Sequence, residues 1–217
     1  MLAAPAPSWN LEDLRAGDEQ AFGELVDSLH PSMFRLASAL LGDARHAQDL
    51  VQDVWVAVID GLDGFEERSS LKTWVLRILT NRARTLAVKL GRAERLGWME
   101  EDADEGERAL PAERFRWTGG WRTPPRPWAS PHEDPESALM RLWLREVLSR
   151  SIDALPPGQR AVVVLRDVEG LDAGESAAVL GLTESNLRVL LHRGRSKLRT
   201  MIEAELADVP SPREGQP

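Results

Sequence analysis

Apolar residues along this chain recur three and four positions apart from Asn10 to about Leu206, except between residues 98 and 134. This spacing is typical of amphipathic helices, and the chain lacks the alternation that would indicate strands. Pro31 is expected to begin a helix, because a proline fits the first helical turn. In the first half of the chain, the pattern predicts helices over 10–15, 18–30, 31–41, 44–61 and 71–90.

The second half begins with predicted helices over 136–153, 158–168 and 172–180, and a turn at Gly181 leads to a last helix over 183–199. Thr183 is a plausible N-cap for that helix. Its inward stripe contains Leu187, Leu190, Leu191 and Leu198, and its outward stripe contains Arg188, His192, Arg195 and Arg199. Two helices joined by a short glycine turn, the second cationic on one side, indicate a helix-turn-helix that enters the DNA major groove. The alternative is a solvated helix with an ordinary charged face.

The predicted fold class is all-α, with two small helical domains over 10–97 and 135–206. Residues 98–134 combine an acidic run with prolines, glycines and tryptophans, and are expected to form a flexible linker. Residues 1–9 and 207–217 are expected to be disordered tails. The linker tryptophans, which either dock on a partner or contact the two domains, are Trp117, Trp121 and Trp128.

Charge is distributed unevenly along the chain, whose net charge is −8. Residues 11–60 contain ten acidic and three basic residues. By contrast, residues 71–97 contain seven basic residues and one acidic residue, and residues 184–199 contain five and one. Phosphate binding depends on local cation density, so these two basic segments are candidate nucleic-acid surfaces. The acidic remainder is suited to a basic protein partner.

The composition argues against several classes of protein. The chain has no cysteine, no apolar run of membrane-spanning length and no export signal at its start, so we expect a cytoplasmic protein without membrane insertion. It contains no glycine-rich phosphate loop, no histidine pair at metal-ligand spacing and no serine-centred nucleophile motif. We therefore expect no enzyme activity, cofactor, bound metal or small-molecule substrate.

Four stretches, taken in order, resemble the bacterial RNA polymerase sigma factors of the extracytoplasmic-function (ECF) group of the sigma-70 family. They are GDEQAFGELVDSLHPSMFRLASALLGD, DARHAQDLVQDVWVAVIDGLDGF, LKTWVLRILTNRARTL and LPPGQRAVVVLRDVEGLDAGESAAVLGLTESNLRVLLHRGRSKLR. The first three look like the family's region 2, and the fourth resembles its region 4. The resemblance implies a subunit that binds core polymerase and directs transcription to particular promoters.

The resemblance assigns a partner to the acidic side of the predicted helix over 44–61. In this family the corresponding helix binds a coiled coil of the largest polymerase subunit, and region 4 binds the polymerase flap. Asp49, Gln52 and Asp53 match the coiled-coil-binding helix. From charge alone, a solvated acidic face is the alternative.

The resemblance also places promoter contacts around the helix over 71–90. The family's loop before this helix captures a flipped base of the minus-ten element, and here that loop is 63–70, with Phe65. Asn81 matches a position that contacts promoter bases, although an amide satisfying local backbone is the alternative. Trp74 is expected to be a core residue. The cations expected to follow the melted strand are Arg77, Arg82 and Arg84.

In the fourth stretch, the resemblance implies that the last predicted helix reads the minus-thirty-five element as duplex DNA. The residues of its first turns, which would face base edges, are Thr183, Glu184, Ser185, Asn186 and Arg188. The residues expected to hold phosphates are His192, Arg193, Arg195 and Lys197. Gly174 and Ser176 depart from the family pattern, and they predict a weak first helix in the helix-turn-helix.

We therefore expect a promoter-specificity subunit whose partners are core RNA polymerase, promoter DNA in duplex and melted form, and an anti-sigma factor. The main alternative is a conventional helix-turn-helix regulator whose first domain senses a signal or dimerises. That alternative leaves the basic helix over 71–90 and the acidic helix over 44–61 without a role. A protein-only adaptor would leave both basic segments unexplained.

Overall fold

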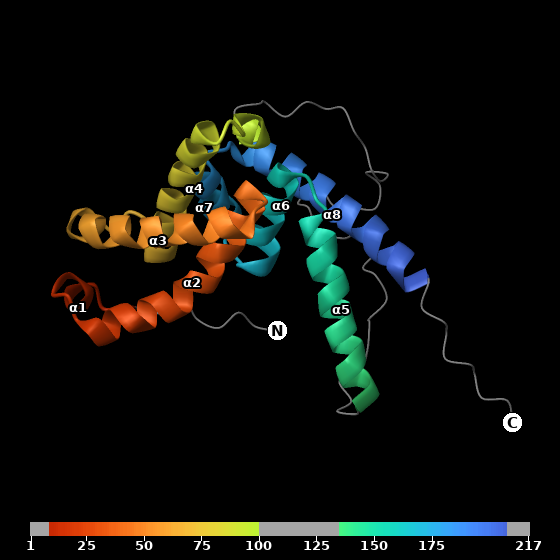
Figure 1. Ribbon diagram of the computed structural model, residues 1–217, viewed down its shortest axis with the longest axis horizontal. Coiled ribbons are helices and arrows are strands. Elements are labelled where there is room, and N and C mark those ends of the chain that lie inside the picture. Colours follow the sequence, from red (N-terminus) through yellow and green to blue (C-terminus); the bar gives the residue numbers. More distant parts are fainter. Residues whose placement is uncertain (1–8, 100–134, 208–217) are drawn as a thin grey trace, which may run out of the picture.

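The computed structural model describes residues 9–99 and 135–207, which form helices and short connections without a strand (Figure 1). Residues 1–8, 100–134 and 208–217 are outside this description. Most of the predicted tails, most of the linker and the proposed docking of its tryptophans therefore lie outside the described residues. Within them, the all-α prediction is confirmed.

The first domain follows the predicted order of helices closely. It contains α1 (Leu11–Arg15), α2 (Glu19–Leu41), α3 (Ala44–Gly61), η1 (Leu62–Gly64), α4 (Leu71–Lys89) and η2 (Ala93–Met99). Side-chain oxygens at the start of the four α-helices accept hydrogen bonds from first-turn backbone amides. These capping residues satisfy donors that a helix otherwise leaves open. They are Asn10, Asp18, Asp43 and Ser70.

The predicted helix boundary at Pro31 is wrong, because α2 continues through this proline. Residues on both sides of it form one buried stripe, which comprises Leu25, Leu29, Met33, Leu36 and Leu40. An interior proline costs a helix about 3 kcal/mol. Burying several leucine-sized side chains contributes about 1.5–3 kcal/mol each, so packing outweighs the local penalty.

The second domain contains α5 (Pro135–Asp153), α6 (Pro157–Val163), η4 (Val164–Val168), α7 (Ala173–Leu180) and α8 (Glu184–Ala207). The predicted helix over 158–168 is divided, because its second half, η4, forms a wider π-helical turn. The amide of Glu169 bonds to the carbonyl of Val164, and that of Leu171 bonds to the carbonyl of Leu165. Gly170 then reverses the chain with a φ of 73°.

Helix α7 is better stabilised than its composition predicts. Asp172 and Glu175 form a capping box, in which each side chain accepts a hydrogen bond from the other residue's backbone amide. Gly181 ends the helix in the left-handed conformation that glycine adopts without strain. Ser176 is fully buried in the helix-turn-helix. The weak helix predicted from Gly174 and Ser176 is therefore stabilised at its start by a capping box that the prediction did not include.

The two domains pack directly against each other (Figure 1). Helix α7 lies against α4, and α6 lies against α2, so the helix-turn-helix is attached to the first domain. Buried apolar side chains from both domains form one cluster. Helices α5 and α8 extend away from this contact region. The packing brings the two basic segments of the sequence into one body.

Candidate nucleic-acid interface

Helix α3 presents its acidic side to solvent. Asp49, Gln52 and Asp53 are exposed, whereas Leu50 and Val54 are buried against the rest of the bundle. Val56 and Ile59 lie on the exposed side as well, with 60% and 57% of their surfaces accessible. Ile59 is therefore an apolar residue that lies outside the core. Ile59 follows Gln52 by seven residues, close to two helical turns, and therefore shares its face.

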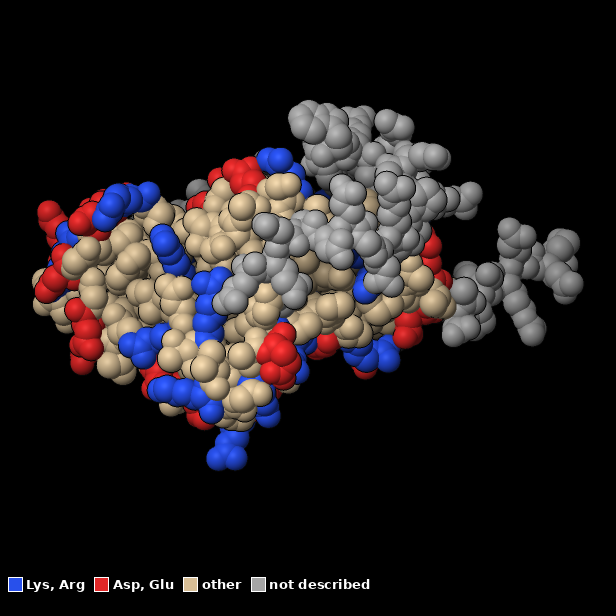
Figure 2. Space-filling view, turned by 90° about the horizontal axis from the view of Figure 1, so that it is seen from above, with Lys and Arg blue, Asp and Glu red and all other residues tan. Residues whose placement is uncertain are grey.

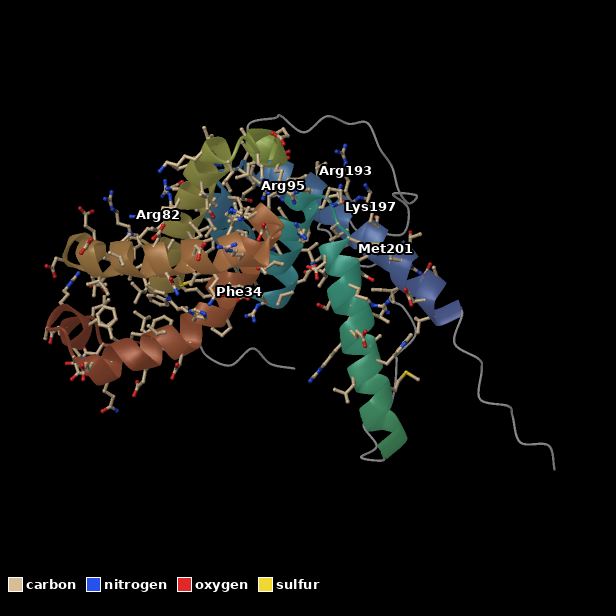
Figure 3. The ribbon with its side chains drawn as sticks, viewed as in Figure 1. Phe34, Arg82, Arg95, Arg193, Lys197 and Met201 are labelled. Atoms are coloured by element: carbon tan, nitrogen blue, oxygen red, sulfur yellow. The ribbon has the colours of Figure 1, made fainter. Side chains whose placement is uncertain are left out.

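Helix α4 exposes the expected polar residues Arg77, Asn81 and Arg82. Figure 3 shows Arg82 projecting from α4 on the side nearer α3. Arg84, which follows Arg77 by seven residues and is only partly exposed, instead contacts the second domain, because its Nη2 donates a 2.8 Å hydrogen bond to the carbonyl of Leu180 in α7. The structure therefore brings three of these four residues to an open surface and places the fourth at the domain contact.

Phe65 lies in the core and does not face the solvent, contrary to the role that the sequence suggested. Only 5% of its surface is exposed, and its ring packs on that of Trp74 with centroids 5.0 Å apart. Two large aromatic rings bury more apolar area together than either could in an exposed loop. Trp74 is partly buried against the core, as predicted.

The rest of the loop before α4 remains at the surface. Residues 66–70 are exposed, and Glu67 has a φ of 56°, which is uncommon for a residue with a side chain. The loop is anchored by Arg15, whose Nη2 donates a 2.7 Å hydrogen bond to the carbonyl of Phe65. Anchoring by Arg15, far away in the sequence, was not predictable from local pattern.

Helix α8 begins as predicted, with the Thr183 hydroxyl accepting a 3.2 Å hydrogen bond from the amide of Asn186. Glu184, Ser185 and Arg188 are exposed on the first turns, and Arg188 pairs with Glu184 at 2.7 Å. Asn186 is only 8% exposed, so in this conformation it does not face the surface where bases would bind. It lies next to buried Leu187 on the inward side of the helix.

The basic residues farther along α8 differ in their hydrogen-bond partners and in the shifts of their pKa values. Arg195 makes two hydrogen bonds to Asp167, of 3.0 and 2.5 Å, and these raise its pKa. Burial lowers the pKa of His192, which favours its neutral form at physiological pH. Figure 3 shows Arg193 and Lys197 projecting from α8, well separated from Arg82.

The surface carries charges of both signs. In the view of Figure 2, Lys and Arg side chains are numerous in the middle of the face, and Asp and Glu side chains lie at its left end and at several other places around it. The described residues contain no cluster of three or more histidine or carboxylate side chains suited to a metal ion. Within the same residues, every helix is too short or too polar to cross a membrane.

A two-helix motif with an exposed basic helix, joined to a bundle with a second basic helix, defines a DNA-binding protein. Comparison with family models matches residues 25–93 to "Sigma-70 region 2" and residues 145–198 to "Sigma-70, region 4". The chain therefore belongs to the ECF group of the sigma-70 family and is a sigma factor, which directs RNA polymerase to promoters. Sigma factors are regulators and not enzymes.

Individual relatives agree with this assignment. The chain is 32% identical over 186 residues to the ECF sigma factor SigE of Mycolicibacterium smegmatis, covering 84% of this chain and 63% of SigE. It is 24% identical over 192 residues to the ECF sigma factor SigW of Bacillus subtilis, and this match covers 88% of this chain and 94% of SigW. A solved structure of the sigma factor RpoE with the anti-sigma factor NepR from Bartonella quintana has a similar fold. The two folds match with a TM-score of 0.55 at 20% sequence identity, and the match covers 86% of this chain and 99% of the RpoE chain.

Proposed function

We propose that the exposed face of α3 is the surface through which this sigma factor binds core RNA polymerase. Asp49 and Asp53 supply negative charge, and Val56 and Ile59 supply apolar area beside it. A partner helix with basic and apolar residues would complement this face, as the coiled coil of the largest subunit does in the family. The coexistence of this face with two exposed basic helices is the observation that carries the proposal.

The exposed side of α4 is proposed to hold the melted promoter strand. Arg77 and Arg82 can follow the backbone phosphates, and Asn81 can pair with a base that has left the stack. Because Phe65 is buried, base capture by the preceding loop is assigned to its exposed residues, 66–70. Arg84 joins this surface only when its bond to Leu180 is broken.

The start of α8 is proposed to read the upstream element in the major groove. Ser185 and Arg188 are exposed where base edges would lie, and an arginine can bind guanine through two hydrogen bonds. Arg193 and Lys197 would hold phosphates and fix the register of the helix. On this proposal, 10–97 and 135–206 act as separate domains in the cytoplasm, without catalysing a reaction.

An anti-sigma factor is the proposed inhibitory partner. A groove of about 830 Å³ lies between the two domains, with apolar walls that include Phe34, Leu148 and Ile152. Arg35 and Arg145 line the same groove. An amphipathic segment with acidic residues would complement these walls and would hold both domains at once.

Run-off transcription with purified core polymerase tests the proposed function. We expect defined transcripts from promoter fragments only when this chain is added. Asp53→Arg should prevent binding to core polymerase, so the protein should no longer co-purify with core and no transcripts should form. Asp27→Arg, at an exposed position on α2, should leave both core binding and transcription intact. Asn81→Ala should preserve core binding and reduce promoter melting. Duplex binding by the chain alone, without any transcript in the presence of core, would instead support a conventional regulator.

A further inference from the structure

Glu169, which the sequence pattern did not single out, is a buried carboxylate from the second domain that the first domain surrounds. Its side chain is only 3% exposed. It accepts hydrogen bonds from the hydroxyl of Ser32, from Arg35 Nε at 2.7 Å and from Lys72 Nζ at 2.9 Å. Lys72 also bonds to the carbonyl of Glu169, at 3.2 Å. We call these four residues the Glu169 cluster.

Besides the bond from Arg84 to Leu180, two further side-chain contacts join the domains. Arg160 of α6 donates bonds of 3.2 and 3.0 Å to the carbonyl of Ala39, near the C-terminal end of α2. The hydroxyl of Thr73 of α4 donates a 3.2 Å bond to the carboxylate of Glu175 of α7. The domain contact is therefore a specific polar interface as well as an apolar one.

This packed arrangement is incompatible with simultaneous binding to both promoter elements. Leu180 is bonded to Arg84 of α4. Thr183, at the start of α8, follows Leu180 by three residues, so the Cα atoms of Leu180 and Thr183 lie within about 11 Å of each other. Elements centred near minus ten and minus thirty-five are separated by about 25 base pairs, which is about 85 Å of duplex. The two domains must separate before both elements can be bound.

We propose that the Glu169 cluster is an autoinhibitory latch, which keeps the free chain closed and must break when the chain engages polymerase and promoter. The functional part of this inference rests on the sigma activity proposed above. Among the interdomain contacts, Glu169 is the charged group that depends most on the other domain, since its three side-chain partners all belong to α2 and α4. Removing its charge would leave Arg35 and Lys72 without their shared anion.

The distance between the domains provides a direct test, because the chain contains no native cysteine. Spin labels can be attached to a full-length Ser28→Cys/Thr200→Cys background, at exposed positions on α2 and α8. We expect one narrow distance distribution in this background, and a longer, broader one after adding Glu169→Gln or Arg35→Gln. Glu203→Gln is the matched control, because it removes a carboxylate that pairs with Arg199 inside α8.

An unchanged distance distribution in a folded Glu169→Gln protein would overturn the latch. If Glu169→Gln fails to fold, Arg35→Gln decides the question in the same way, since Arg35 is half-exposed and outside the proposed polymerase and promoter surfaces. In run-off transcription, opening should lower the concentration of chain needed for half-maximal product by about fivefold. A chain that supports no transcription at all would refute the proposed function, while the distance measurement would still decide the latch.

Discussion

Arg84 of α4 donates a 2.8 Å hydrogen bond to the backbone carbonyl of Leu180, the last residue of α7. A carbonyl at the C-terminal end of a helix is a favourable site for a cation, because the helix leaves it without an internal partner. A residue that the family resemblance assigns to promoter DNA is thus bound to the helix-turn-helix in the closed chain. The same cation cannot track a DNA backbone until the two domains separate.

Substitutions in α8 should separate base recognition from phosphate binding. Arg188→Ala should lower affinity for a preferred upstream element by about 1–3 kcal/mol and leave binding to unrelated duplex nearly unchanged. Lys197→Ala should weaken both, and should reduce the slope of log affinity against log salt concentration by about one. Fluorescence anisotropy of polymerase holoenzyme on matched duplexes at several salt concentrations measures both effects. A uniform loss for Arg188→Ala would remove its assigned role in base recognition.

Replacing Phe65 should affect the stability of the fold more than promoter melting. Phe65→Ala removes a ring that is 95% buried and packed on Trp74, and should lower the free energy of unfolding by about 3–5 kcal/mol. Phe65→Leu keeps most of the volume, so its cost should stay below about 1.5 kcal/mol. Urea denaturation and permanganate footprinting of open complexes check this expectation. Normal stability with defective melting in Phe65→Leu would restore the base-capture role.

Two glycines of the second domain should respond in opposite ways to alanine. A Cβ at Gly174, in α7, would meet no atom closer than 3.4 Å, so Gly174→Ala should stabilise the domain by about 0.5–1 kcal/mol. A Cβ at Gly194, in α8, would lie 2.9 Å from Val163 Cγ2 and 3.3 Å from the carbonyl oxygen of Gln159. Gly194→Ala should therefore destabilise the domain by about 1–3 kcal/mol. Thermal unfolding of the two variants, compared at equal protein concentration, checks both signs.

The contribution of Glu169 should depend on pH in a defined direction. Burial acts to raise its pKa, but hydrogen bonds from Ser32, Lys72 and Arg35, together with the charge of Lys72, outweigh burial and lower the pKa below its ordinary value. A lowered pKa means that the stabilisation is present above the ordinary value and is lost as pH falls through the lowered one. The stability difference between wild type and Glu169→Gln should be constant over about pH 6–8 and shrink below about pH 4. Urea unfolding across this range measures it, and a difference that shrank near pH 7 would contradict this assignment.

The helices and most of their starting residues could be read from the sequence, because hydrophobic spacing and N-capping are local properties. Thr183 caps the helix for which it was predicted, and the exposed acidic side of α3 lies where the pattern placed it. The order of the four matching stretches also sufficed to indicate the family. These features depend on residues within a few turns of one another.

Tertiary structure alone decided the features that depend on distant partners. Pro31 did not end its helix, because buried side chains on both sides of it pack against α3 and α4. Phe65 moved from a predicted base contact to the core, because Trp74 offered it an apolar surface. Glu169 became an interdomain anchor because packing brought it to Ser32, Arg35 and Lys72, which lie about a hundred or more residues away in sequence. Periodicity determines which face of a helix is apolar, but it cannot specify which distant side chain will satisfy a buried charge.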